Sequence, residues 1–159
     1  DLPARDLEPD ELARLVEDLA AQPELWAEHV AFTTGNRHYA SLHRDGNVDV
    51  WLLCWTEEQD TGWHDHDLSS GAFHVVEGTL RETNLRVGGA HRVRIVGAGE
   101  TVPFGPEHIH RLVANEPRAV SIHAYSPPLW RLGTYAIDED GILRRESISY
   151  AEELRPIEA

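Results

Sequence analysis

The sequence predicts an all-β domain, a barrel or sandwich of short strands with short helices at its N-terminus. After residue 36, short apolar segments rich in β-branched and aromatic residues recur, and Gly, Asn and Asp turn signals separate them. The chain has 159 residues, the usual length of one domain. We therefore expect a single domain over residues 1–159, with N-terminal helices at 9–31, a barrel at 36–130, and a hairpin and tail at 131–159.

The N-terminal segment carries the helical pattern. Residues 9–11 are Pro-Asp-Glu, a typical helix start with acidic groups near the positive end of the helix dipole. Apolar residues then recur at helical spacing between residues 12 and 20. Pro23 interrupts this pattern, so a second short helix is expected over residues 23–30.

The predicted strands are short and closely spaced, which is typical of a barrel or sandwich. They cover residues 48–55, 71–87 with a break at Glu77-Gly78, 91–95, 101–104, 109–113 and 119–125. Residues 135–150 predict a hairpin around the turn at 138–141.

Composition limits the classes of partner. The chain has 14 Lys and Arg against 28 Asp and Glu, a net charge of −14, which disfavours binding to nucleic acid or anionic membranes. No apolar run approaches the ~20 residues of a membrane span, and the first residues lack a signal-peptide pattern. The single cysteine, Cys54, excludes a disulfide within the chain. We expect a cytoplasmic protein that is a monomer or a small homo-oligomer.

Histidines suggest a metal site. The chain has 10, and most lie between residues 64 and 123. His64 and His66 are two apart, so on a strand both face one side while Asp65 faces the other. His108 and His110 form a second pair of this kind. One such pair is equally well explained by two exposed histidines, but two pairs in a short chain favour a metal.

A third group of polar residues shares one strand face. Ser121, His123 and Tyr125 alternate within residues 119–125. They indicate either an edge strand with polar side chains directed to solvent or a polar group directed into a site.

The histidine pairs stand in motifs that resemble those of the cupin superfamily. The first cupin motif is a His-x-His pair followed by a strand and a glycine turn; the second is a Pro-x-Gly turn followed by a histidine and an asparagine. The matching residues are His64, His66, Gly78, Pro103, Gly105, His110 and Asn115. The resemblance implies a double-stranded β-helix, or jelly-roll barrel.

Many cupins add a glutamate ligand four or five residues after the His pair, where this chain has Ser70 and Gly71. Three neutral histidines would leave the full double charge of Fe(II) uncompensated. Such a metal favours an anionic ligand, and a metal-bound thiol loses its proton readily. The site thus suits a thiolate.

Residues 119–128, Ala-Val-Ser-Ile-His-Ala-Tyr-Ser-Pro-Pro, closely resemble the cysteine dioxygenase family, as do Trp-His-Asp-His at 63–66 and Ile-His-Arg at 109–111. The resemblance covers residues 48–130. It implies an enzyme, a non-haem Fe(II) oxidoreductase that adds both atoms of O2 to a small thiol and yields a sulfinic acid. It also implies that Ser126-Pro127 is cis.

Carried over residue by residue, the resemblance implies iron ligands and a polar relay. His64, His66 and His110 match the ligands, with His108 as the competitor for the third place. Tyr125 matches the tyrosine that faces the open coordination positions, and the residues that orient it are His123 and Ser121.

The substrate side departs from the family. Its cysteine-binding arginine follows a tyrosine by two positions, and at Tyr39 this places Ser41 there. Arg37 and Arg44 are the candidates to replace it. Without such an arginine, a free carboxylate loses its bidentate partner. Candidate substrates are therefore cysteine, 3-mercaptopropionate, cysteamine and ergothioneine.

Two further positions are expected beside the substrate. Trp55 matches a tryptophan near the pocket, although packing would also explain it. Gly71 stands where many animal members have a cysteine that crosslinks to the active-site tyrosine. Cys54 lies in an apolar strand, so no crosslink is expected, as in bacterial relatives.

Two other classes of function stay open at this stage. One is a cupin hydrolase or isomerase that uses another metal. The other is a non-catalytic cupin that binds a small molecule.

Overall fold

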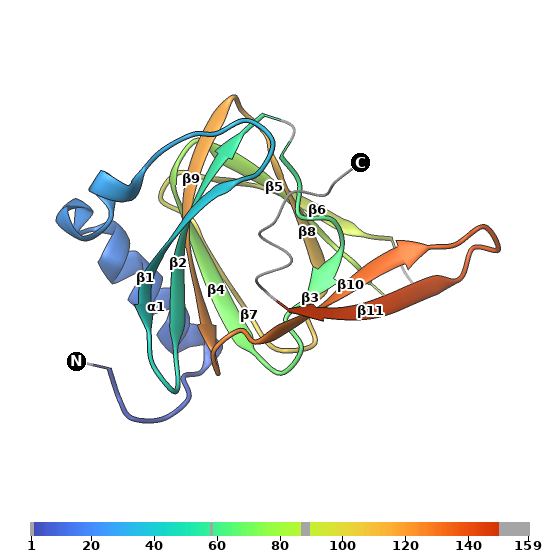
Figure 1. Ribbon diagram of the computed structural model, residues 1–159, viewed down its shortest axis with the longest axis horizontal. Helices are drawn as coiled ribbons and strands as arrows, with labels where there is room; N and C mark the ends of the chain where they lie inside the picture. The colour runs from blue at the N-terminus through green and yellow to red at the C-terminus, as the bar shows by residue number, and fades with distance from the viewer. Residues whose placement is uncertain (1, 58, 87–89, 150–159) are drawn as a thin grey trace.

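The computed structural model describes residues 2–57, 59–86 and 90–149, which form two antiparallel sheets closed into a barrel (Figure 1). The five-stranded sheet has the order β1-β2-β9-β4-β7 and the six-stranded sheet the order β11-β10-β3-β8-β5-β6. The strands are β1 (His38–Arg44), β2 (Asp49–Thr56), β3 (His64–Asp65), β4 (Ser70–Glu77), β5 (Thr79–Asn84), β6 (Arg92–Gly97), β7 (Thr101–Phe104), β8 (His110–Ala114), β9 (Arg118–Ser126), β10 (Arg131–Ile137) and β11 (Leu143–Ser149).

Helix α1 (Pro9–Ala20) begins where the sequence predicts it. A capping box fixes its start, because the backbone N–H of Glu8 donates to the Glu11 carboxylate at 3.1 Å. Helix α1 lies against the outer face of the five-stranded sheet (Figure 1), and its buried side chains Leu12 and Val16 belong to the apolar cluster between them. The helix therefore covers one side of the barrel.

The predicted second helix at 23–30 is wrong. Two 3-10 turns occupy the segment, η1 (Pro23–Leu25) and η2 (Ala27–His29). Between them Trp26 has φ −140°, outside the helical region, and its indole N–H donates to the Leu19 carbonyl at 2.9 Å. Anchoring the indole to the end of α1 turns the chain instead of continuing a helix.

The strand predictions are largely confirmed. Strand β1 is absent from them because its residues alternate between half-buried and exposed, which gives little apolar signal. The C-terminal hairpin begins earlier than predicted, at Arg131, and projects from the barrel (Figure 1). Its predicted last residue, Tyr150, lies outside the described residues. The Ser126–Pro127 peptide is cis, as predicted.

Strand β9 divides its side chains between two cores. Val120, Ile122 and Ala124 join the apolar cluster under α1. The intervening residues, which include Ser121, His123 and Tyr125, face the barrel interior and are buried. Strand β9 is hydrogen bonded to β2 on one side and β4 on the other, so the edge-strand alternative is wrong.

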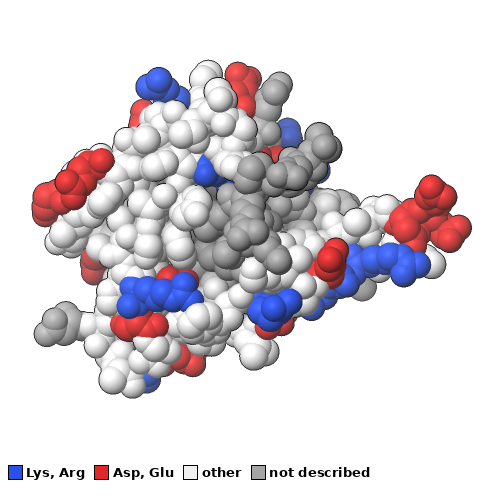
Figure 2. Space-filling view, in the orientation of Figure 1, with Lys and Arg blue, Asp and Glu red and all other residues white. Residues whose placement is uncertain are grey.

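Charge is divided into small groups on the face seen in Figure 2, where acidic side chains gather at the tip of the projecting hairpin and basic ones beside it. Among the described residues, no helix is both long and apolar enough to cross a bilayer.

Gly78, between β4 and β5, gives a stability prediction. Its φ is +75°, and a Cβ there would collide with the Arg118 carbonyl. Gly78→Ala should lower the free energy of unfolding by about 2–4 kcal/mol, because left-handed strain and a backbone clash add. Gly35→Ala is the control, since φ is +87° there but nothing lies within 4 Å; it should cost about 1–2 kcal/mol. Urea unfolding measures both variants, and an equal loss of unfolding free energy in the two would contradict the clash at Gly78.

Candidate metal centre

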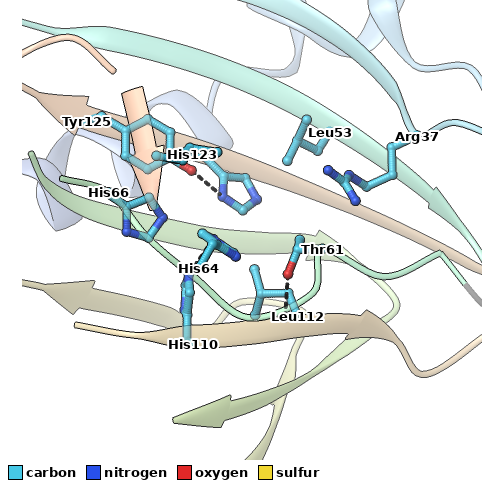
Figure 3. A pocket seen from close by; sticks show the side chains of 10 residues that line it. Arg37, Leu53, Thr61, His64, His66, His110, Leu112, His123 and Tyr125 are labelled. Carbon is cyan, nitrogen blue, oxygen red and sulfur yellow. Dashed lines mark hydrogen bonds between the residues drawn. The ribbon is translucent and has the colours of Figure 1, made fainter. Parts of the chain in front are cut away.

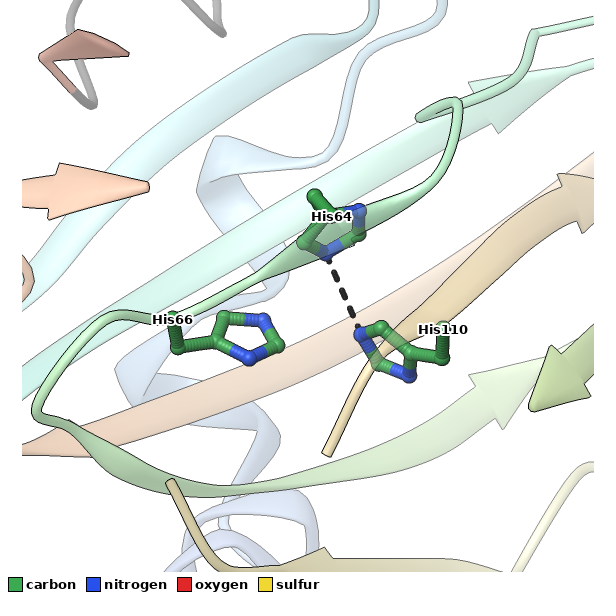
Figure 4. Close-up of side chains that lie close together, drawn as sticks. All are labelled: His64, His66 and His110. Carbon is green, nitrogen blue, oxygen red and sulfur yellow. Dashed lines mark hydrogen bonds between the residues drawn. The ribbon is translucent and has the colours of Figure 1, made fainter. Parts of the chain in front are cut away.

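Three histidine rings meet inside the barrel (Figure 4). His64 on β3 pairs directly with His110 on β8, and His66 follows β3 on the same side as His64. One ring nitrogen from each lies within 4.8 Å of the others. All three side chains are buried. As predicted, Asp65 points away, toward the hairpin, where Tyr135 and Arg145 bind its carboxylate.

Two of these rings have their tautomers fixed. The Nδ1 of His64 lies 3.0 Å from the Gly62 carbonyl, and the Nδ1 of His110 lies 2.7 Å from the Glu82 carboxylate. Both partners are acceptors, so each Nδ1 carries the hydrogen. Burial lowers the pKa of both histidines, so each ring is neutral and its Nε2 presents a lone pair.

The two lone pairs point at each other. The Nε2 atoms of His64 and His110 are 3.1 Å apart (Figure 4). With both hydrogens on Nδ1, neither Nε2 can donate to the other, and the contact is repulsive without a cation. The donor set therefore fits a metal ion.

His66 supports the same interpretation. It is 1% exposed, and neither ring nitrogen has a hydrogen-bond partner among the described residues. Burial, and then the neighbouring His64, lowers its pKa well below the ordinary value, so the ring is neutral. A buried polar group without a partner costs about 1–3 kcal/mol, which a metal bond would offset.

Glu82 is the buried carboxylate behind His110. Burial alone would raise its pKa, but hydrogen bonds from His108 and His110 and the ion pair with Arg94 at 2.7 Å lower it below its usual range. The group is therefore ionised, and a carboxylate behind a histidine fixes the ring and strengthens its donor nitrogen.

His108 is not one of the three converging rings, although its own ring packs edge-on against that of His110 with centroids 4.8 Å apart. It precedes β8, in the turn after Gly105, so the prediction that it shares a strand with His110 is wrong. Its ring binds Asn84 at 2.8 Å and Glu82 at 3.2 Å. Glu82, His108 and His110 also lie close enough to hold a metal, but hydrogen bonds within the group already occupy these donor atoms.

A polar chain leads from the core to the pocket, and Figure 3 shows its last link, between His123 and Tyr125. The Trp55 indole N–H donates to Ser121 Oγ at 2.9 Å, and Ser121 Oγ lies 2.7 Å from His123 Nε2. His123 Nδ1 lies 3.4 Å from the Tyr125 hydroxyl. Burial lowers the pKa of His123 to about 3, so this ring is neutral. The predicted residues thus meet, with Trp55 at the inner end.

The pocket beside these groups encloses about 320 Å³, part of it open to solvent. Leucines from β2, β8 and β10 form its apolar wall, and the other lining residues are polar or aromatic. The lining residues are Arg37, Leu53, Thr61, His64, His66, His110, Leu112, His123, Tyr125 and Leu132 (Figure 3).

The structure separates the two candidate arginines. Arg37 lines the pocket, with its guanidinium 5.0 Å above the Trp55 ring and a hydrogen bond to the Asp60 carbonyl at 3.1 Å. Arg44 instead stacks on Trp130 at 4.3 Å, outside the pocket lining.

The remaining predicted substrate residues are placed differently. Tyr39 is 44% exposed and packs on Trp51, and Ser41 is exposed on β1; neither lines the pocket. Gly71 lies against the Tyr125 ring. Cys54 is buried in the cluster under α1, apart from the core that contains Tyr125.

Two residues that contact the candidate metal-binding histidines, Glu82 and Phe104, are absent from the predicted site residues. Glu82 had a detectable signal, because it takes the inward position two residues after buried Leu80 on an alternating strand. Phe104 looks like any core residue, and only the structure shows its stacking on His66.

A model of the family "Cysteine dioxygenase type I" matches residues 3–138. This chain belongs to the cysteine dioxygenase type I family. Cysteine dioxygenase type 1 of Homo sapiens is 27% identical over 132 residues, which cover 75% of this chain and 65% of that protein. The Danio rerio protein of the same name is 27% identical over 140 residues, covering 79% and 69%. The chain thus spans about two thirds of the length of these family members.

Solved structures support the fold. A double-stranded β-helix protein of Klebsiella pneumoniae matches with a TM-score of 0.56 and 13% identity, over 75% of this chain and 91% of that one. KdgF from Halomonas sp. matches with a TM-score of 0.54 and 18% identity, over 65% and 92%. At such identities the likeness concerns the fold alone, and the predicted cupin barrel is confirmed.

The two histidines of the Glu82 group give a test of the donor set. His110→Ala should lower Fe(II) affinity more than about 100-fold, because it removes a donor, whereas His108→Ala should lower it less than about 10-fold. Anaerobic titration with a competing chelator measures both. An equal loss of Fe(II) affinity in the two variants, or stoichiometric iron in His110→Ala, would show that His110 is not a metal donor.

Proposed function

We propose that this chain is an Fe(II)-dependent thiol dioxygenase. The reaction is R–SH + O2 → R–SO2H; both oxygen atoms enter the product, and sulfur supplies all four electrons. The observation that carries the proposal is a set of three buried, neutral imidazoles beside the Tyr125 hydroxyl, in a chain of the cysteine dioxygenase type I family. A cytoplasmic location, a single domain and a monomer or small homo-oligomer stay predictions from the sequence.

His64, His66 and His110 would hold the metal. Fe(II), when bound, supplies the redox chemistry that O2 requires and a double positive charge that favours a thiolate. The protein contributes neutral ligands, a carboxylate behind His110 and an apolar wall of leucines.

The polar chain orients Tyr125. An indole N–H can only donate, so Ser121 Oγ accepts a hydrogen bond from Trp55. The Ser121 hydroxyl in turn donates to His123 Nε2. His123 then carries its hydrogen on Nδ1, directed at the Tyr125 oxygen. In this arrangement the Tyr125 hydroxyl donates into the pocket, toward bound substrate or oxygen.

Arg37 indicates the class of thiol. It is the one arginine among the described residues that line the pocket, and Trp55 lies under its guanidinium. A planar guanidinium suits a carboxylate, which it binds with two parallel hydrogen bonds. We therefore propose a small thiol carboxylate, such as cysteine or 3-mercaptopropionate, in preference to cysteamine or ergothioneine.

The test is O2 uptake by the anaerobically Fe(II)-loaded protein with cysteine, 3-mercaptopropionate, cysteamine and ergothioneine, with the sulfinate identified by mass. Uptake with a thiol carboxylate is expected. Equal turnover of cysteamine would contradict the role of Arg37. Iron binding without uptake of O2 for any thiol would contradict the dioxygenase and favour a non-catalytic cupin. Activity restored by another metal, for another reaction, would favour a different cupin enzyme.

Arg37→Gln should raise the KM for the thiol carboxylate about 10-fold to 100-fold, because a charge-assisted pair is lost. Arg44→Gln is the control, since Arg44 does not line the pocket; its KM should match that of the unmodified protein. Steady-state O2 uptake measures both variants. An unchanged KM in Arg37→Gln would contradict the role of Arg37 and favour a carboxylate-binding site on β1.

Tyr125→Phe should lower kcat about 10-fold or more while iron content stays stoichiometric, because it removes a hydrogen-bond donor beside the reacting atoms and no metal donor. Iron analysis and O2 uptake on the same sample separate the two effects. Full turnover in the variant would contradict the assigned role.

A further inference from the structure

The ring of His66 is held differently from its two partners. Hydrogen bonds at Nδ1 fix His64 and His110, whereas His66 makes none with the described residues. Rotation about the last bond of a histidine side chain is soft, so packing must select the ring plane. The groups that pack on His66 therefore decide where its donor nitrogen points.

Two aromatic rings pack on His66 in nearly parallel fashion. The centroid of Phe104 is 4.7 Å away with an interplanar angle of 29°, and that of Tyr125 is 5.2 Å away at 27°. Phe104 in turn stacks on His108 at 4.9 Å and 16°. The stacked rings thus run from Tyr125 through His66 and Phe104 to His108, and hydrogen bonds with Glu82 and Asn84 anchor the His108 end.

Gly71 explains how both rings reach His66. On β4 it pairs with Phe104 of β7 on one side and with Tyr125 of β9 on the other. A Cβ at Gly71 would lie 2.5 Å from Phe104 Cζ and 3.0 Å from Tyr125 Cδ1. Its φ is not positive, so space, and not backbone conformation, requires glycine here.

Phe104 has little freedom to give way. It is 5% exposed and stacked on both His66 and His108. A side chain at position 71 would therefore push the Phe104 ring against His66 instead of into open space.

We propose that Phe104, seated in the space that Gly71 leaves open, is the positioning residue that sets the ring plane of His66 and so the geometry of the metal centre. The proposal rests on the proposed metal site. In this proposal Phe104 and Gly71 act together, because the lack of a side chain at Gly71 is as necessary as the Phe104 ring itself.

The test uses Co(II), whose visible spectrum reports coordination geometry, with four variants: Phe104→Leu, Gly71→Ala, the double variant, and Val102→Ala as control. Val102 is buried on the same strand but stacks on no histidine. Affinity, spectrum and thermal midpoint are measured for each.

Phe104→Leu and Gly71→Ala should each change the Co(II) spectrum and lower affinity about 10-fold, the equivalent of one or two lost stacking contacts. Gly71→Ala should add less than about 2-fold in the Phe104→Leu background, because the closer contacts, those with the Phe104 ring, are then gone and only the 3.0 Å contact with Tyr125 remains. Val102→Ala should lower the thermal midpoint and leave the spectrum unchanged.

An unaltered spectrum and affinity in Phe104→Leu would overturn the proposal, as would an equal cost of Gly71→Ala in both backgrounds. Failure of the unmodified protein to bind Co(II) would instead contradict the metal centre on which the proposed function depends. If Phe104→Leu does not fold, Gly71→Ala alone still decides, because an unchanged spectrum there contradicts the proposal.

Discussion

The hydrogen bond from His110 Nδ1 to the buried Glu82 carboxylate links the candidate metal centre to the barrel. It fixes the tautomer of His110, so that Nε2 faces His64 across the β3–β8 pairing. The same carboxylate binds His108 and Arg94, and through them β5, β6 and the turn before β8 share one ionic group. A buried carboxylate with these partners stays ionised, and its position leaves the lone pairs of two neutral imidazoles converging on one point.

Strand β9 supplies the second constraint. Its central place in the five-stranded sheet buries both faces, so one set of alternate residues packs on α1 and the other enters the barrel. A Ser-x-His-x-Tyr pattern on the inner set must satisfy its polar atoms internally, which Trp55 and the pocket allow. Because the residues of β9 that face α1 must be apolar, the alternate residues must face the barrel interior. This register brings Tyr125 beside His66.

Packing, and not hydrogen bonding, completes the centre. Gly71 leaves room for Phe104 and Tyr125 to stack on His66, which is the one of the three converging histidines whose ring nitrogens have no hydrogen-bond partner among the described residues. On the substrate side, Arg37 lies over Trp55 at the pocket, although it precedes β1 in the chain. Arg37 can therefore face the pocket although it does not stand at the position of the family arginine, which Ser41 occupies. For this reason the spacing of the motif alone could not identify the class of substrate.

The sequence by itself determined the barrel class, the inward faces of β9 and the His64–His66 pair, because strand alternation fixes these locally and the motifs of the cysteine dioxygenase family mark them. Alternation could not separate His110 from His108, since the turn after Gly105 takes His108 out of the strand. Only the tertiary structure brought Glu82, Phe104 and Arg37 to the site and left Arg44 and Ser41 outside the pocket lining. These placements depend on contacts between strands distant in sequence, and no local pattern encodes such contacts.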